Sequence, residues 1–249
     1  MRPVHLYGTL FLSSRGVENF VERWYNINKL LINICSGDKV IRYIKANKQV
    51  LYFVLLAAFA GFYFLSEHLF SLQYHSVWVP LDDKIPFIPA FVIPYVLWYP
   101  YIPAGLLAVY LTDRKAMTKQ AWILFSGMTL CVLCFLFFPS RIDFRGDASG
   151  SDIFSMICRI IYGSEDSVNV YPSLHCYEAT AIHLSTFVSG PLKNKVGLRI
   201  GSAVLTVLIC LSTVFVKQHS VVDLFAGCLL AVLSFATVNI IYHLRGVKK

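Results

Sequence analysis

Six apolar stretches fill most of the chain after residue 48, and they constrain its fold more than any other feature. They cover about residues 49–65, 88–111, 120–138, 173–189, 196–216 and 219–242. Most approach the roughly 20 residues that an α-helix needs to cross a bilayer. Charged residues make up only 14% of the chain, whereas a soluble domain carries about 25%. The sequence therefore predicts an all-α integral membrane bundle of six transmembrane helices, formed by residues 49–249.

The first 48 residues are polar and rich in lysine and arginine. Apolar residues recur at helical spacing between Val17 and Ile44, which predicts an amphipathic helix on the membrane surface. A solvated basic tail is the alternative. The segment has no compact apolar core near its start, so we expect no cleavable signal peptide.

The positive charge is spread between the apolar stretches and does not form one patch. This distribution favours contact with anionic lipid head groups and argues against nucleic acid as a partner. If the N-terminus is cytoplasmic, all but five of the 22 lysines and arginines lie on the inner side. Those on the outer side are Lys84, Arg141, Arg145, Arg159 and Lys217. We therefore expect both termini to be cytoplasmic, in a multi-pass protein of the cell membrane.

The seven cysteines fall mostly within the apolar stretches or at their ends. Cys131 and Cys134 form a C-x-x-C pattern, but it lies in a predicted membrane helix without a second pair or a nearby histidine. We interpret the cysteines as small apolar packing residues. No metal and no other cofactor is expected.

Two histidines begin predicted helices on the same outer side, and helix N-termini attract anions. His175 opens the fourth apolar stretch and His219 opens the sixth. His219 and Asp223 are four residues apart, so they share one face of the predicted helix. The carboxylate can accept the Nδ1–H bond and leave Nε2 free to attack phosphorus, while His175 protonates the leaving oxygen. Each histidine alone is more simply an interfacial residue with a satisfied hydrogen bond, but the pair with Asp223 and Lys217 favours a catalytic site.

At these residues the sequence resembles the type 2 phosphatidic acid phosphatase superfamily, over about residues 80–242. The second motif of that family, P-S-x-H, is matched by Pro172, Ser173 and His175. The third motif, S-R-x5-H-x3-D, is matched in spacing by Ser212, His219 and Asp223. The run from Ser212 to His219 and the stretch 82–89 look like the branch that includes inositol phosphorylceramide synthases and bacterial lipid phosphatases.

The resemblance implies a bundle of six membrane helices and a mechanism that needs no metal. It implies that His219 is the nucleophile and forms a phosphohistidine, that Asp223 orients it, and that His175 is the acid. Two departures stand out. Thr213 occupies the place of the third-motif arginine, and the first motif, K-x6-R-P, keeps only Arg145, with Phe138 and Gly146 in the place of its lysine and proline.

The phosphate-binding residues are predicted to be Arg141, Arg145, Lys217 and the backbone donors near Ser173. An arginine fork can grip two phosphate oxygens at once. Plain anchoring of the two arginines at the head groups is the alternative. Glu178 and His183 lie deeper in the same predicted helix, and we interpret them as partners in hydrogen bonds inside the bundle.

Three functions fit this pattern. The first is a membrane lipid phosphatase that hydrolyses a lipid phosphate monoester or pyrophosphate through a phosphohistidine, at the extracytoplasmic face. The second transfers a phosphate-bearing head group to a lipid hydroxyl with the same residues. The third is a non-enzymatic lipid-binding or transport protein that descends from such an enzyme. We favour the first and expect a lipid phosphate as the substrate.

Overall fold

The computed structural model describes residues 37–69 and 73–246 of the chain. Contacts divide the chain into two units, 1–50 and 51–249. In the first unit the described residues form helix α2 (Gly37–Ala46) and the 3-10 turn η2 (Lys48–Val50). Most of the amphipathic helix predicted between Val17 and Ile44 lies outside the described residues.

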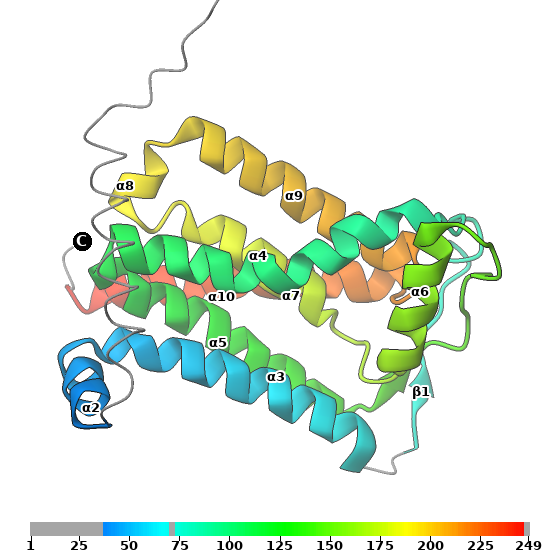
Figure 1. The fold of residues 1–249 in the computed structure, drawn as a ribbon, viewed down its shortest axis with the longest axis horizontal. Helices are drawn as coiled ribbons and strands as arrows, with labels where there is room; N and C mark the ends of the chain where they lie inside the picture. The colour runs from blue at the N-terminus through cyan, green and yellow to red at the C-terminus, as the bar shows by residue number, and fades with distance from the viewer. Residues whose placement is uncertain (1–36, 70–72, 247–249) are drawn as a thin grey trace, which may run out of the picture. The chain divides into compact units, whose positions relative to one another are not determined.

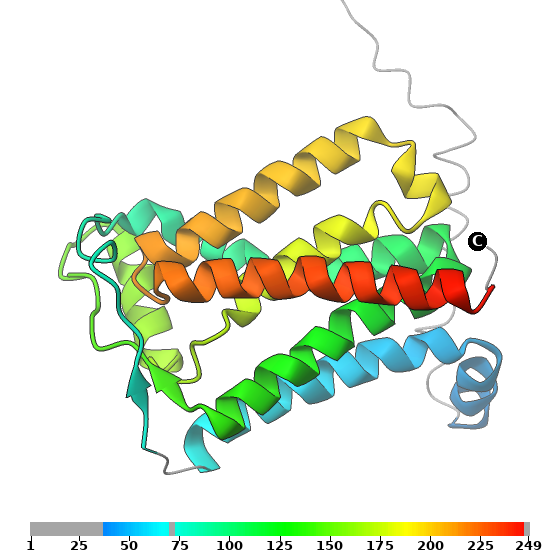
Figure 2. The same cartoon turned by 180° about the vertical axis from the view of Figure 1, so that it is seen from behind.

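The second unit is mainly helical, as expected. Its elements are α3 (Leu51–Leu69), β1 (His75–Ser76), η3 (Pro89–Phe91), α4 (Val92–Thr112), α5 (Arg114–Phe137), β2 (Ser140–Arg141), α6 (Ile153–Ser164), α7 (Leu174–Ser185), α8 (Gly190–Lys193), α9 (Val196–Phe215) and α10 (Val221–Leu244). The long helices run side by side, and α6 lies with β1 and β2 at the end where α7 and α10 begin (Figures 1 and 2). The all-α prediction did not include the short parallel pairing of β1 with β2.

Four helices are long and apolar enough to cross a membrane, by length and composition: Pro89–Thr112, α5, α9 and α10. Along α10, large apolar side chains such as Phe225, Leu229 and Leu233 are more than half exposed. Exposed apolar faces of this size are expected where lipid replaces water. Among the described residues, two shorter apolar helices fall short of the criterion, Lys48–Tyr63 and α6 (Ile153–Ser164). Helix α7 has only 12 residues and is not long enough either.

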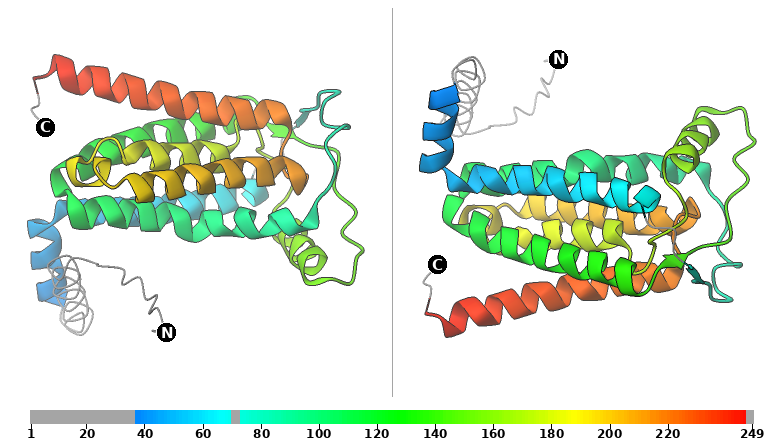
Figure 3. Two further views of the ribbon diagram at one scale, coloured as in Figure 1. Left: turned by 90° about the horizontal axis from the view of Figure 1, so that it is seen from above. Right: turned by 90° about the horizontal axis from the view of Figure 1, so that it is seen from below.

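Helix α7 is short because it is the interior helix of the bundle. At 1.5 Å per residue it is about 18 Å long, against the roughly 30 Å of a bilayer core. It contacts α4, α5, α9 and α10, and most of its side chains are buried. Figure 3 shows the surrounding helices from two sides. Polar groups on α7 are therefore shielded from lipid by other helices.

A close approach between α7 and α10 depends on Gly227. A Cβ atom at this position would lie 2.4 Å from the backbone oxygen of Ser173 and 3.1 Å from the Cβ atom of Cys176. Only glycine avoids that overlap, so the sequence permits α10, which begins just after His219, to touch the start of α7 backbone to backbone.

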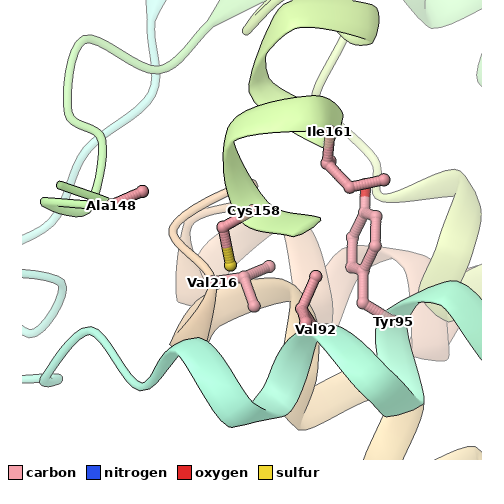
Figure 4. Close-up of a cluster of buried hydrophobic side chains, with 6 residues drawn as sticks. All are labelled: Val92, Tyr95, Ala148, Cys158, Ile161 and Val216. Atoms are coloured by element: carbon pink, nitrogen blue, oxygen red, sulfur yellow. The ribbon is translucent and has the colours of Figure 1, made fainter. Parts of the chain in front are cut away.

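Helix α6 covers the end of the bundle where the histidines lie. Asp152 caps its N-terminus by accepting hydrogen bonds from the backbone N–H groups of Phe154 (2.9 Å) and Ser155 (3.0 Å). Side chains of α6 join a cluster of buried hydrophobic residues, which consists of Val92, Tyr95, Ala148, Cys158, Ile161 and Val216 (Figure 4). The sequence predicts a short helix over residues 152–162 with Ile153, Met156, Ile157 and Ile160 on one side. Ile157 packs against the cluster, but the other three are exposed, because Cys158 and Ile161 face the bundle instead.

Candidate active site

His175 and His219 lie together at the end of the bundle covered by α6. Their ring centroids are 5.5 Å apart, and both side chains are buried. His175 is the second residue of α7. Its ring packs against Trp98 and Tyr95 of α4, with centroid distances of 4.2 and 4.7 Å. The structure thus brings together the two histidines that the sequence placed 44 positions apart.

His219 also contacts Asp223, but not as two residues on one helix face. His219 precedes Ser220, the N-cap residue of α10, so it lies outside the helix that we expected it to open. Asp223 completes a capping box, in which its Oδ2 accepts the backbone N–H of Ser220 at 2.9 Å. The same oxygen lies 3.4 Å from Nδ1 of His219. The capping box therefore fixes the carboxylate that faces the imidazole.

The side chain of Asp82 binds the N-terminal end of α10. Its side chain accepts hydrogen bonds from the backbone N–H of Val221 (2.9 Å) and from the hydroxyl of Ser220 (2.7 Å). We expected the first donors of this helix to be open to an anion, but the carboxylate already binds them. Asp82 is 3% exposed. Its role at this helix end was not predicted, because Ser220 and Val221 lie more than a hundred residues away in the sequence.

Lys217 binds the loop that contains Asp82. The residue adopts a left-handed conformation, with φ of 52°. Its Nζ donates to the backbone oxygens of Asp82 (2.7 Å) and Ile85 (2.5 Å). Two of the three ammonium donors are therefore engaged by the protein, so the predicted phosphate contact has at most one donor left.

Arg145 forms a hydrogen bond with Gln218, the residue that precedes His219. Its guanidinium donates to Oε1 of Gln218 and, at 2.9 Å, to the backbone oxygen of Glu165. It also lies 4.5 Å above the ring of Tyr162, whose hydroxyl donates to the backbone oxygen of Val216 at 2.7 Å. Burial lowers the pKa of Arg145, yet an arginine stays charged at neutral pH. A fixed positive charge thus lies beside the turn that carries His219.

Gly146 explains one departure from the family pattern. A Cβ atom there would lie 2.1 Å from the ring of Phe87. A proline in this place would collide with that ring, whereas glycine lets the loop after Arg145 pass close to it.

The other two predicted phosphate-binding residues have other contacts. Arg141 forms an ion pair with Asp143 (Nε to Oδ1, 2.8 Å), and both side chains are about half exposed. Ser173 is fully buried and caps α7 by accepting the N–H of Cys176 at 3.4 Å. The backbone N–H of Ser173 donates to the backbone oxygen of Asp223 at 3.1 Å, which ties the two histidine-bearing segments together.

Several buried polar atoms around the histidines lack a hydrogen-bond partner in the described part of the chain. They are Nε1 of Trp98, Nε2 of His175, Nε2 of Gln218, Nδ1 of His219 and Oδ1 of Asp223. Buried polar groups are nearly always satisfied, so an unsatisfied group in a native fold needs a reason. Five such atoms on neighbouring side chains indicate a place for a polar ligand.

An apolar cavity of about 310 Å³ adjoins His175. Its apolar lining comes from helices α3, α4 and α5, with Phe53, Ala57, Ala60, Ile102, Met128 and Val132 among the residues. Its polar side chains include Glu165, His175 and Glu178. Glu165 accepts hydrogen bonds from the hydroxyls of Tyr95 (2.5 Å) and Tyr99. The cavity can hold an apolar chain whose polar end meets His175.

Two further predictions concern α7 and the cysteines. His183 Nδ1 lies 3.1 Å from the hydroxyl of Ser202, in the kind of hydrogen bond that we expected inside the bundle. Within the described residues, Cys176, Cys210 and Cys228 place their sulfur atoms within 4.8 Å of one another. Three thiols at this spacing have the donor set for a soft cation, although we expected the cysteines to serve packing alone.

Comparisons with protein-family models, with curated proteins and with solved structures found no match for this chain. The chemistry of the site therefore has to be inferred from its own residues. They provide one imidazole beside a carboxylate, a second imidazole near it, a buried guanidinium and an adjoining apolar cavity.

Proposed function

We propose that this protein is a membrane-bound lipid phosphatase, which hydrolyses a lipid phosphate monoester or pyrophosphate through a phosphohistidine. The observation that carries the proposal is the buried group of His175, His219 and Asp223, with unsatisfied polar atoms on all three side chains. A tetrahedral phosphate offers oxygen acceptors to N–H donors such as Nε2 of His175, while Nδ1 of His219 faces Oδ2 of Asp223 at 3.4 Å. The adjoining apolar cavity fits a lipid chain.

In the first step, Nε2 of His219 attacks phosphorus and the bond from phosphorus to the lipid oxygen breaks. Asp223 stabilises the imidazolium through Nδ1, and His175 gives its proton to the departing lipid alcohol. Water then attacks the phosphohistidine and passes a proton to His175. The P–N bond breaks and its electron pair returns to His219, so inorganic phosphate and the starting enzyme are formed. No metal is needed in either step.

The charge at the two ends of the bundle supports an extracytoplasmic site. Arg114 and Lys119 begin α5, Lys195 and Arg199 flank the start of α9, and Arg245 follows α10. These ends lie away from the histidines. If the basic end is cytoplasmic, as the positive-inside rule requires, the histidines lie outside, and the six crossings predicted from the sequence would leave both termini inside.

The test uses the full chain purified in detergent, with phosphatidic acid, phosphatidylglycerol phosphate and a polyprenyl pyrophosphate as substrates. We expect release of inorganic phosphate from at least one of them, also with chelator present. Label from a ³²P-lipid should stay on the protein as an acid-labile adduct. His219→Ala should abolish the adduct and lower kcat by about 10⁴-fold or more, whereas His175→Ala should lower kcat by about 10²–10⁴-fold.

His183→Ala is the matched control, because it removes a histidine from the same helix outside the site. It should retain the adduct. Activity that disappears with chelator contradicts the metal-free steps. The other two functions give different results: a transferase moves label to a lipid hydroxyl without free phosphate, and a lipid-binding protein keeps its binding in His219→Ala and forms no adduct.

A further inference from the structure

Gln218 is a buried side chain whose role the catalytic steps leave open. It directly precedes His219 and is 4% exposed. The backbone N–H groups of Gln218 and His219 both donate to the backbone oxygen of Thr213, at 2.9 and 3.1 Å. This shared acceptor fixes the turn, so the amide of Gln218 and the imidazole of His219 are held at adjacent positions of one rigid segment.

Arg145 determines which way the Gln218 amide points. A guanidinium has donors only, so the amide atom that faces it must be the oxygen. The usual ambiguity between the nitrogen and oxygen of a glutamine is therefore removed here. Nε2, with two N–H donors, faces away from Arg145 and has no partner among the described residues, although it is buried.

We propose that Nε2 of Gln218 binds a non-bridging oxygen of the phosphate that is transferred to His219, with Arg145 as the group that orients the amide. This inference rests on the proposed phosphatase function. A donor fixed before the reaction stabilises the charge that the equatorial phosphate oxygens carry in the transition state. The guanidinium also polarises the amide and strengthens its N–H donors.

Thr213 shows why another donor is needed here. It occupies the place where the third motif of the family carries arginine, but its side chain is fully buried and donates to the backbone oxygen of Cys210 at 2.8 Å. It brings no positive charge. Arg145 and Gln218 together supply a charge and a directed donor from the other side of the turn.

The competing explanation is that Gln218 only holds Arg145 in place. Gln218→Glu separates the two, because glutamate keeps an acceptor oxygen for Arg145 and lacks the N–H donors. If Gln218 only positions Arg145, this variant keeps wild-type kinetics. If Gln218 binds phosphate, the variant puts a carboxylate oxygen against a phosphate oxygen and loses both affinity and rate.

The experiment measures kcat, KM and inhibition by orthovanadate, a phosphate analogue, for the full-length protein in detergent. We expect Gln218→Glu to weaken vanadate inhibition at least about tenfold and to lower kcat by about 10²-fold, as for other removed oxyanion donors. Gln218→Met, which has similar length and no N–H donor, should change in the same direction, and wild-type vanadate inhibition in it overturns the inference even if the glutamate variant does not fold.

Wild-type vanadate inhibition in either folded variant overturns the inference and leaves the phosphatase intact. A wild-type protein that neither hydrolyses lipid phosphates nor binds vanadate overturns the proposed function itself. The two failures are therefore distinguishable.

Discussion

Replacing Gly227 by alanine is expected to damage catalysis without touching any catalytic side chain. Gly227 lies on α10 where that helix meets the start of α7. The new Cβ atom would lie 2.4 Å from the backbone oxygen of Ser173. Since a carbon–oxygen contact needs about 3.3 Å, the shortfall is about 0.9 Å. The oxygen belongs to the backbone and cannot rotate away, so one of the two helices has to shift.

That shift acts on the catalytic geometry because Ser173 caps α7 two residues before His175. A displacement of about 1 Å at a reacting group costs about 10²-fold in rate. Overpacking of a well-filled interior costs about 1–3 kcal/mol of stability. We therefore expect Gly227→Ala to fold with a lowered unfolding temperature and to lose about 10²-fold in kcat.

The assay is phosphate release under saturating substrate, together with thermal unfolding in detergent. Gly201→Ala is the matched control, since Gly201 lies on α9 and a Cβ atom there meets nothing within 4 Å. It should behave as the wild type does. If Gly227→Ala keeps wild-type kcat, the contact between α7 and α10 does not set the distance between the histidines, and this reasoning is refuted.

Two further substitutions test the loops around the site. Asp82→Ala should lower the free energy of unfolding by about 1–2 kcal/mol, as loss of a helix cap does, because the hydroxyl of Ser220 and the N–H of Val221 lose their acceptor. The control is Asp83→Ala, at the exposed neighbouring residue. Equal unfolding temperatures in the two variants contradict this prediction. Arg145→Lys should lower kcat/KM at least about tenfold, since one ammonium cannot replace a fork. Arg141→Lys, at the half-exposed ion pair, should change little, and an equal loss in the two variants would contradict a specific role of Arg145 in the site.

The helices were predictable because their signals are local. The stretch 196–216 became α9, Val196–Phe215, and the segment 152–162 became α6, Ile153–Ser164. Apolar runs bounded by charged or capping residues determine such boundaries within a few positions. The start of α10 was predicted two residues early, at His219, although the sequence carries a capping box from Ser220 to Asp223 that marks the boundary.

The contacts that build the site were not predictable in the same way. Asp82 and Ser220 are separated by 138 positions, and Arg145 and Gln218 by 73. A polar residue in a loop is normally solvated, and no local pattern distinguishes one that will be buried against a distant helix end. The family resemblance indicated His175, His219 and Asp223, but the residues that contact and orient them depend on the packing of this chain.

The residues that position the histidines differ from the residues that we propose to react. The distance between the histidines follows from backbone contacts: Gly227 lets α10 approach α7, and the N–H of Ser173 bonds to the backbone oxygen of Asp223. Neither contact needs an imidazole. The reacting groups, in contrast, bury polar atoms without partners, which lowers stability. Because buried polar groups are nearly always satisfied, these unpartnered atoms in a site fixed by other residues argue for a bound polar ligand.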